Sequence, residues 1–266
     1  MEFLHILMLA LLQGLTEFLP ISSSGHLILP KELLGWQDQG LVFDVAVHLG
    51  SLSAVLIYFR RDVWLLGRDW TLQVFARRDA NEHSRLAWML LVATWPVCLV
   101  GLLADNWIEQ HLRSISVVAW ATLGFGLVLG WADWRGSRSK TLTDLTWMLA
   151  LTIGLAQVLA LIPGTSRSGI TISMALLLGL QRQDAARFSF LLSIPVILAS
   201  GGYKTLQLVT QGGAVPWADL FLATLIAGLS AFLCIHYFLR FIEQIGMTPF
   251  VIYRLLLGGV LLYLAS

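Results

Sequence analysis

The sequence contains little charge. Only 12% of its 266 residues are charged and 57% are hydrophobic, whereas an ordinary soluble domain has about 25% charged residues. The mean hydropathy is +0.77. The net charge of +1 at pH 7 gives no basic surface of the kind that binds nucleic acid. This composition predicts an all-α polytopic membrane protein with no nucleic-acid partner.

Cysteine is also scarce. Both cysteines, Cys98 and Cys234, lie in apolar runs, where a small buried side chain is a commoner role than a disulfide or a metal ligand. No basic segment precedes the first apolar run, so we expect no cleaved signal peptide. The sequence also lacks the Walker phosphate loop, the GxSxG elbow and the dinucleotide fingerprint. It therefore offers no motif of a soluble enzyme.

What the sequence does contain is apolar runs near the length of about 20 residues that a helix needs to cross a bilayer. Residues 60–85 carry six arginines and are predicted to be a polar loop after the first of these runs. About six full spans are expected, at residues 43–58, 86–104, 115–131, 188–208, 220–239 and 250–264.

Two further apolar runs are shorter and lead into polar breaks. The run at residues 3–12 is followed by a break at 20–26, and the run that begins at residue 145 is followed by a break at 163–171. Irregular backbone at membrane depth persists only where it is buried in protein or lines a wet cavity. Each break is therefore predicted to be the tip of a re-entrant helical hairpin.

The two hairpins align with each other. A shift of 144 residues places Gln13 on Gln157 and Ser24 on Ser168. We interpret this as an internal duplication within one membrane domain, with repeat one at about 1–134 and repeat two at about 145–266. Because each copy holds an odd number of full crossings, the repeat is inverted, and the two tips should meet near the bilayer midplane.

Basic residues are concentrated in the loops assigned to one face, which marks the cytoplasmic side. The first hairpin and both termini are then expected on the outer side, and the second hairpin on the cytoplasmic side. The basic residues of the cytoplasmic side are Arg60, Arg61, Arg68, Arg77, Arg78, Arg85, Arg135, Arg138, Lys140, Arg182, Arg187 and Arg240.

The first break has an acidic and hydroxyl-rich character. Gln13 and Glu17 are four residues apart and share one helix face. A carboxylate at this depth needs an arginine, a metal ion or a proton as partner. Glu17 either bonds to backbone at the break, or binds a divalent cation with a phosphate, or orients a nucleophile and its water. His26 of the same break is a candidate nucleophile or general acid and base.

The first break also contains three hydroxyl groups, which act either as helix caps or as ligand contacts. They belong to Ser22, Ser23 and Ser24.

The second break is basic and suits an anion. The forked guanidinium of Arg167 can clamp a phosphate through two parallel hydrogen bonds, with structural pairing to Glu17 as the alternative. Backbone N–H groups freed at Gly164 and Gly169 are further donors. The remaining candidate phosphate contacts of this break are Thr165, Ser166, Ser168 and Thr171.

Some polar residues elsewhere carry weaker signals. Asp44 and His48 are four apart near the start of a span, where an ordinary helix-start pair is favoured over a metal pair. His236 and Arg254 are interpreted as partners within one helix.

Two segments resemble the signature sequences of the bacterial undecaprenyl-diphosphate phosphatases, also called the bacitracin-resistance family. These are QGLTEFLPISSSGH at residues 13–26 and PGTSRSG at residues 163–169. The resemblance covers the full length, including FSFLLSIP at residues 188–195. The family accepts Glu or Gln at position 13, and glutamine removes one possible metal carboxylate.

The resemblance implies hydrolysis of the C55 isoprenyl diphosphate to the monophosphate and inorganic phosphate, which recycles the lipid carrier for cell-wall synthesis in the bacterial inner membrane. It also implies a divalent cation, commonly Mg²⁺ or Ca²⁺, with Glu17 as its ligand and Gln13 beside it. The oligomeric state is left open, a homo-oligomer included. The residues implied to be catalytic or in contact with the diphosphate are Glu17, Ser23, His26, Ser166, Arg167 and Thr171.

Transport is the competing class. Inverted repeats with broken helices at the midplane are common in secondary transporters, so the same features suit a lipid-phosphate flippase or an anion transporter. A transporter needs only reversible binding, whereas a candidate nucleophile beside an acid and a phosphate clamp is surplus to that task. The sequence therefore favours the phosphatase.

Overall fold

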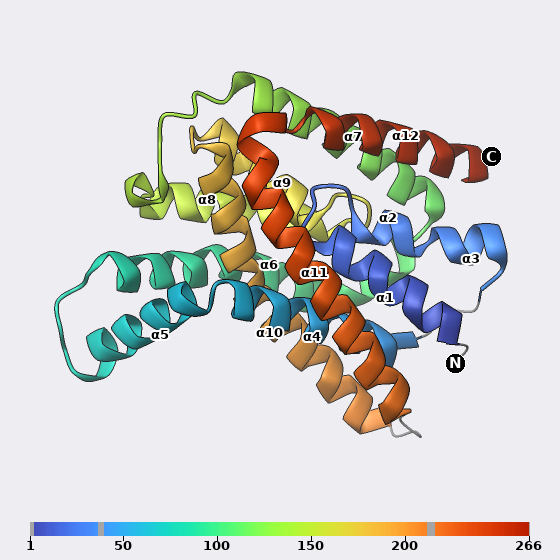
Figure 1. The fold of residues 1–266 in the computed structure, drawn as a ribbon, viewed down its shortest axis with the longest axis horizontal. Coiled ribbons are helices and arrows are strands. Elements are labelled where there is room, and N and C mark those ends of the chain that lie inside the picture. The colour runs from blue at the N-terminus through green and yellow to red at the C-terminus, as the bar shows by residue number, and fades with distance from the viewer. Residues whose placement is uncertain (1–2, 37–39, 212–215, 266) are drawn as a thin grey trace.

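The computed structural model describes residues 3–36, 40–211 and 216–265, and within these ranges it holds helices and no strand (Figure 1). Within the described residues, six helices are long and apolar enough to cross a membrane, which confirms the predicted polytopic α-helical class. They are α4 (Gly40–Tyr58), α6 (Glu82–His111), α7 (Ile115–Arg135), α10 (Arg182–Gln211), α11 (Trp217–Ile245) and α12 (Thr248–Ala265).

The stretch predicted to be a polar loop is helical, and that prediction was wrong. Residues Arg60–Phe75 form α5, which packs against α6. The carboxylate of Asp69 is buried beneath this pair, where it accepts hydrogen bonds from Arg68 at 2.7 Å and from Asn81 at 2.8 Å. These donors, Arg68 foremost, hold the pKa of Asp69 below its usual value. The six arginines of residues 60–85 suggest a loop. The charge pattern of a sequence does not reveal that an acidic side chain, Asp69, is buried between helices.

The shorter apolar runs form interrupted helices, as the sequence predicts. In the first half, α1 (Phe3–Glu17) is followed by a break and then by α2 (Ser23–Leu27) and α3 (Leu29–Leu34). In the second half, a 3₁₀ turn η1 (Leu142–Asp144) precedes α8 (Trp147–Gln157), the 3₁₀ segment η2 (Val158–Leu161), a break and α9 (Arg167–Leu177). Each half therefore contains two short helices on either side of a polar break.

The two breaks share one unusual backbone geometry. Ser22 and Ser166 both have positive φ, 73° and 70° respectively, a region that non-glycine residues occupy only under local constraint. Each serine caps the next helix by accepting a hydrogen bond from the N–H three residues on, that of Gly25 or Gly169. The two serines are separated by the same shift of 144 residues that aligns the hairpins, so this match supports the internal duplication.

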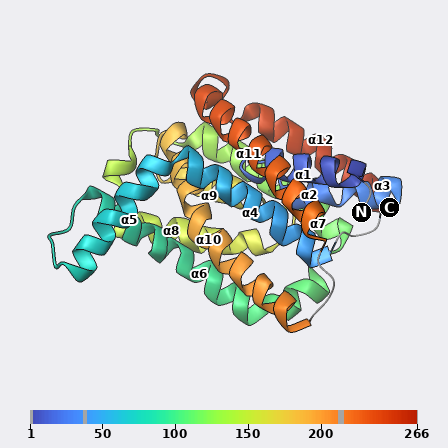
Figure 2. The same cartoon turned by 60° about the horizontal axis from the view of Figure 1, so that its bottom comes forward.

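Each interrupted hairpin packs against spans of the other half of the chain. α1 packs on α11 as α8 packs on α6, and α4 packs on α11 as α10 packs on α6 (Figures 1 and 2). The N-terminal end of α1 and the C-terminal end of α12 lie at one end of the molecule, and α5 lies at the opposite end (Figure 1). The limits of the two repeats and their orientation in the bilayer stay predictions.

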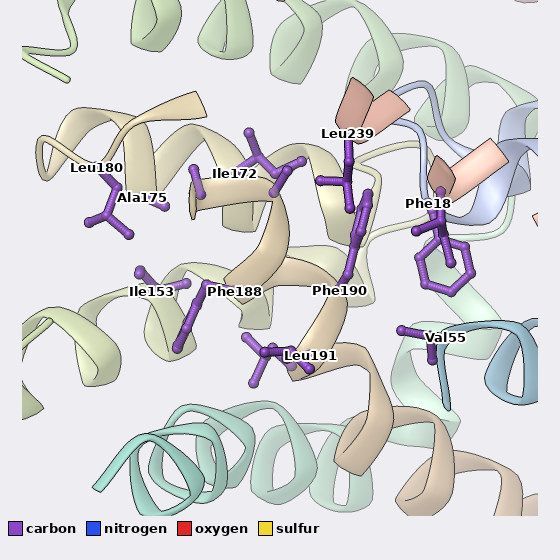
Figure 3. Packing of buried hydrophobic residues seen from close by; sticks show 14 of the residues in the cluster. Phe18, Val55, Ile153, Ile172, Ala175, Leu180, Phe188, Phe190, Leu191 and Leu239 are labelled. Atoms are coloured by element: carbon purple, nitrogen blue, oxygen red, sulfur yellow. The ribbon is translucent and has the colours of Figure 1, made fainter. Parts of the chain in front are cut away.

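The main hydrophobic core lies next to the breaks. Phe188 and Phe190 on α10 are fully buried, and the ring of Phe18, which directly follows α1, meets Phe190 edge to face with centroids 5.2 Å apart (Figure 3). Ile172 of α9 belongs to the same cluster. Because this cluster includes Phe18 from the first break and Ile172 from the helix after the second, it fixes the two hairpins relative to the spans.

Gly14 sets the closest approach of α1 to α11. A Cβ atom on Gly14 would lie 2.0 Å from Ser230 Oγ and 2.4 Å from the carbonyl oxygen of Ala227. We therefore expect Gly14→Ala to lower the thermal midpoint in detergent, since overpacking costs about 1–3 kcal/mol and outweighs the helix propensity gained, about 1 kcal/mol. Gly124→Ala on α7 is the matched control, because its added Cβ meets nothing within 4 Å. Equal midpoints for the two variants would contradict this packing.

Candidate active site

A polar cavity of about 170 Å³ lies where the two breaks meet. Ser168 Oγ of the second break donates a hydrogen bond of 2.9 Å to the carbonyl oxygen of Leu19 in the first, so the two tips are in direct contact. The sequence prediction that the tips converge is thus confirmed by the structure. The cavity is lined by Glu17, Ser22, Ser23, Ser24, His48, Ala160, Ile162, Gly164, Ser166 and Arg167.

Glu17 and Arg167 face each other across this cavity. Arg167 Nη2 lies 3.3 Å from Glu17 Oε1, and only 11% and 9% of the two side chains are exposed. Arg167 Nη1 donates to the carbonyl oxygen of Ser189 at 2.9 Å, and the guanidinium lies 5.8 Å from the ring centroid of Phe18. The guanidinium is therefore held on two sides, and Glu17 is the partner that an anion could replace.

The other carboxylate oxygen of Glu17 is a shared acceptor. Gln13 Nε2 donates to Glu17 Oε2 at 3.0 Å, and Ser23 Oγ donates to the same oxygen at 3.3 Å. Ser23 also lines the cavity, so a residue of the lining carries a hydroxyl that is hydrogen-bonded to a carboxylate. This is the arrangement in which a carboxylate can accept the proton of an attacking hydroxyl.

His48 belongs to the site, although the sequence favoured an ordinary helix-start role for it. Its Nδ1 bonds to the carbonyl oxygen of Asp44 at 2.7 Å, which makes Nδ1 the donor and leaves Nε2 as the acceptor for Gln13 Nε2 at 3.2 Å. Nε2 also lies 3.9 Å from Glu17 Oε2. The signal in the sequence was an ionisable residue inside an apolar span.

His26 lies beside the cavity and not in its lining. Its Nδ1 bonds to the carbonyl oxygen of Ser22 at 2.7 Å, and its Nε2 lies 2.7 Å from Tyr253 Oη. A carbonyl oxygen only accepts, so Nδ1 carries the proton and a neutral ring accepts from Tyr253 at Nε2. Both ring nitrogens are thus engaged, and the predicted catalytic role of His26 stays a prediction.

The hydroxyls of the second break are bonded mostly within the protein. Ser166 lines the cavity and caps α9. Thr171 Oγ1 donates to the carbonyl oxygen of Arg167 at 2.8 Å and lies 2.7 Å from Ser189 Oγ. It therefore links the backbone of Arg167 to Ser189, the residue that the guanidinium also contacts. Thr165 and Ser168 are fully buried behind the lining. The hydroxyl of Ser168 donates to Leu19, whereas Thr165 Oγ1 has no hydrogen-bond partner. The phosphate contacts predicted for Thr165, Ser168 and Thr171 stay predictions.

Gly164 is required by the local backbone. Its φ is +97°, and a Cβ atom there would lie 2.3 Å from the carbonyl oxygen of Val118 on α7. Only glycine satisfies both conditions. The glycine of this break therefore lets the cavity wall lie directly against α7.

The pairing predicted for Arg254 was wrong. His236 lies on α11 and Arg254 on α12, and the guanidinium of Arg254 donates to backbone carbonyl oxygens instead. A single arginine inside the apolar sequence of residues 248–265 was the available signal. The sequence could not show which backbone it would meet.

The residues around Glu17 fit a divalent cation only if phosphate oxygens of a substrate supply further ligands. Among the described residues there is no group of three or more His, Cys, Asp or Glu side chains that could hold a metal ion. However, Gln13, whose Nε2 contacts Glu17, has a buried Oε1 with no hydrogen-bond partner. One carboxylate and one amide oxygen match the way Mg²⁺ is commonly held, with phosphate oxygens and water as the other ligands.

Together, the six spans, the two interrupted hairpins and the paired carboxylate and guanidinium at their tips define a polytopic membrane protein with a polar cavity between two hairpins. Residues 6–260 match the family described as bacitracin resistance protein BacA. The chain belongs to this family and is a multi-pass protein of the bacterial inner membrane.

Curated relatives extend over the whole chain. A protein named undecaprenyl-diphosphatase in Saccharophagus degradans is 59% identical over 259 residues, which is 97% of each chain. Proteins of the same name in Teredinibacter turnerae and Nitrosococcus oceani are 59% and 57% identical, with 100% of both chains covered in each case. The resemblance stated from the two motifs is thus confirmed along the full length.

Proposed function

We propose that this protein hydrolyses undecaprenyl diphosphate to undecaprenyl phosphate and inorganic phosphate, which recycles the lipid carrier for cell-wall synthesis and gives resistance to bacitracin. The observation that carries this proposal is the cavity at the two tips, where the Ser23 hydroxyl, the Glu17 carboxylate and the Arg167 guanidinium meet. Full-length identity of 57–59% to proteins named for this activity supports the substrate.

In binding, the diphosphate would replace Glu17 as the partner of Arg167. The guanidinium is held by Ser189 and Phe18 from behind, so its free edge stays directed at the cavity. Ser22, Ser24 and Ser166 line the same space and offer hydroxyls to phosphate oxygens. The prenyl tail would remain in the bilayer, because the tips lie within the helical bundle.

In the chemical step, Ser23 Oγ would attack the terminal phosphorus while its proton passes to Glu17 Oε2. The bond from that phosphorus to the bridging oxygen breaks, and the lipid monophosphate leaves with the bonding electrons. A water oxygen then attacks the phosphoserine phosphorus and the Ser23 oxygen leaves. Ser23 takes back the proton held by Glu17, and the protons of the water leave with inorganic phosphate. Ser23 is favoured over His26 because Ser23 lines the cavity, which His26 does not, and because its hydroxyl contacts the carboxylate.

The divalent cation would be held by Glu17 and by Oε1 of Gln13. When bound, it would neutralise part of the phosphate charge, which is a major component of catalysis in phosphoryl transfer. We also propose that the site is formed by two inverted repeats at about 1–134 and 145–266, supported by the matched geometry of Ser22 and Ser166.

Translocation of the lipid phosphate is the second candidate function, because the interrupted helices of both halves meet at one site. It requires no contact between a hydroxyl and a carboxylate. The hydrogen bond between Ser23 and Glu17 therefore favours hydrolysis.

The experiment is phosphate release from C55 diphosphate by the purified protein, with and without a chelator. We expect turnover when Mg²⁺ or Ca²⁺ is present and a loss of at least about 100-fold after chelation, since the protein alone offers one carboxylate at the site. Activity should return when the cation is added back. Undiminished turnover in the chelator would contradict the cation, and no turnover by folded protein with the cation would favour translocation.

A further inference from the structure

Arg254 is an unusual residue for the interior of a membrane protein. It lies on α12, its residue is 0% exposed, and no ion pair found among the described residues includes it. An arginine keeps its charge in proteins, and a buried charge needs strong compensation. The contacts of this side chain therefore indicate what it is for.

Its five N–H groups meet five backbone carbonyl oxygens. Nε donates to Thr122 at 3.0 Å and Nη2 to Ala121 at 3.4 Å, both on α7. The remaining three bonds reach the breaks. They run from Nη1 to Pro20 at 3.3 Å, from Nη1 to Thr165 at 2.9 Å and from Nη2 to Gly164 at 2.9 Å.

One guanidinium therefore joins the tip of the first hairpin, the tip of the second hairpin and α7. Arg254 itself does not line the cavity, whereas Gly164, whose carbonyl oxygen it binds, does. The guanidinium therefore binds the wall of the cavity from outside. Because it engages carbonyl oxygens of both breaks, it offsets their negative dipole ends beside the proposed anion site.

The surrounding glycines are fitted to this side chain. A Cβ atom on Gly169 would lie 2.9 Å from Arg254 Nη1, and one on Gly126 would lie 3.1 Å from Arg254 Cβ. Gly169 therefore makes room for the guanidinium, in addition to donating its N–H to Ser166.

We propose that Arg254 is a positioning residue of the diphosphate site. It aligns the two breaks so that Glu17 and Arg167 face each other, and it places a positive charge, bonded to carbonyl oxygens and to no carboxylate among the described residues, behind the wall that receives the anion. This inference depends on the proposed phosphatase function, and it assigns Arg254 no contact with the substrate.

The test compares Arg254→Gln and Arg254→Lys with the wild type in the phosphate-release assay, at a temperature well below the thermal midpoint of each variant. We expect kcat/KM to fall about 100-fold for Gln, as displacement of reacting groups by about 1 Å does. Lys keeps the charge but loses the fork, so it should recover part of that loss. Added guanidinium ion at low millimolar concentration should partly restore turnover in the Gln variant.

Arg182→Gln is the matched control for stability. Arg182 also ties separate helices together, through bonds of 2.7 and 2.9 Å to Asp133, but it lies away from the cavity. It should lose thermal stability and keep the wild-type kcat/KM. Arg254 variants with a kcat/KM within about threefold of wild type would overturn the proposal while leaving the proposed function intact, whereas an inactive wild type would overturn the function itself.

Gly126→Ala decides the matter if the Arg254 variants do not fold. Its added Cβ would press on the stem of Arg254, and the substitution changes no residue that lines the cavity. A reduced kcat with a nearly unchanged thermal midpoint would support the positioning role. An unchanged kcat would overturn it.

Discussion

Replacing Arg167 by lysine is expected to lower kcat/KM for phosphate release by about 100-fold or more. Loss of one preorganised donor to a developing negative charge has effects of this size, and a lysine ammonium cannot reproduce the planar fork. Arg167 holds its orientation through Ser189 and Phe18, and a shorter, rounder cation keeps neither contact in the same form. The measurement is the initial rate over a range of C55 diphosphate concentrations.

The control for this variant is Arg182→Lys. Arg182 makes a forked contact with Asp133 outside the cavity, so the same chemical change should lower stability and leave turnover unchanged. Near-native turnover by Arg167→Lys would show that a point charge is enough, and the clamp would have to be abandoned.

The second large effect is expected for the pair formed by Glu17 and Ser23. Glu17→Gln keeps the shape of the side chain but removes the proton acceptor and the negative charge, and Ser23→Ala removes the attacking oxygen. Each change should reduce kcat by about 1000-fold, which is within the range for loss of general base catalysis. The rates are measured at saturating substrate with Mg²⁺ present.

The double variant separates this mechanism from its alternatives. Groups that act as one unit are strongly non-additive, so Glu17→Gln combined with Ser23→Ala should be no slower than either single variant. Multiplied losses would mean that the two residues act in separate steps. A Ser23→Ala protein that retains most of its kcat would move the attack to water, with Glu17 as its base.

Much of the architecture was predictable because the bilayer imposes simple rules. Length and hydropathy identify the six spans, since a helix must satisfy its backbone polar groups within lipid. Polar breaks such as residues 163–171 identify the re-entrant tips for the same reason. The boundaries were less accurate. The helix α6 continues to His111, beyond the span expected at residues 86–104, and the predicted loop at residues 60–85 contains α5, which the buried Asp69 stabilises.

The site was predictable in its composition and less so in its geometry. The sequence identified Glu17, Ser23 and Arg167, which share the cavity. It could not show that His26 is turned toward Tyr253, or that His48 points at Glu17, because these contacts join residues 227 and 31 positions apart along the chain.

The sequence by itself determined the class of this protein, its two polar breaks and the chemical types of group that they hold. Local rules are enough for these features, because a charged side chain or an interrupted helix at membrane depth always needs polar partners inside the protein. The tertiary structure alone decided which of those groups face one cavity, and that a distant arginine, Arg254, joins both breaks from behind. The physical reason is that five backbone carbonyl oxygens from three separate segments can converge on one guanidinium only after the helices have packed.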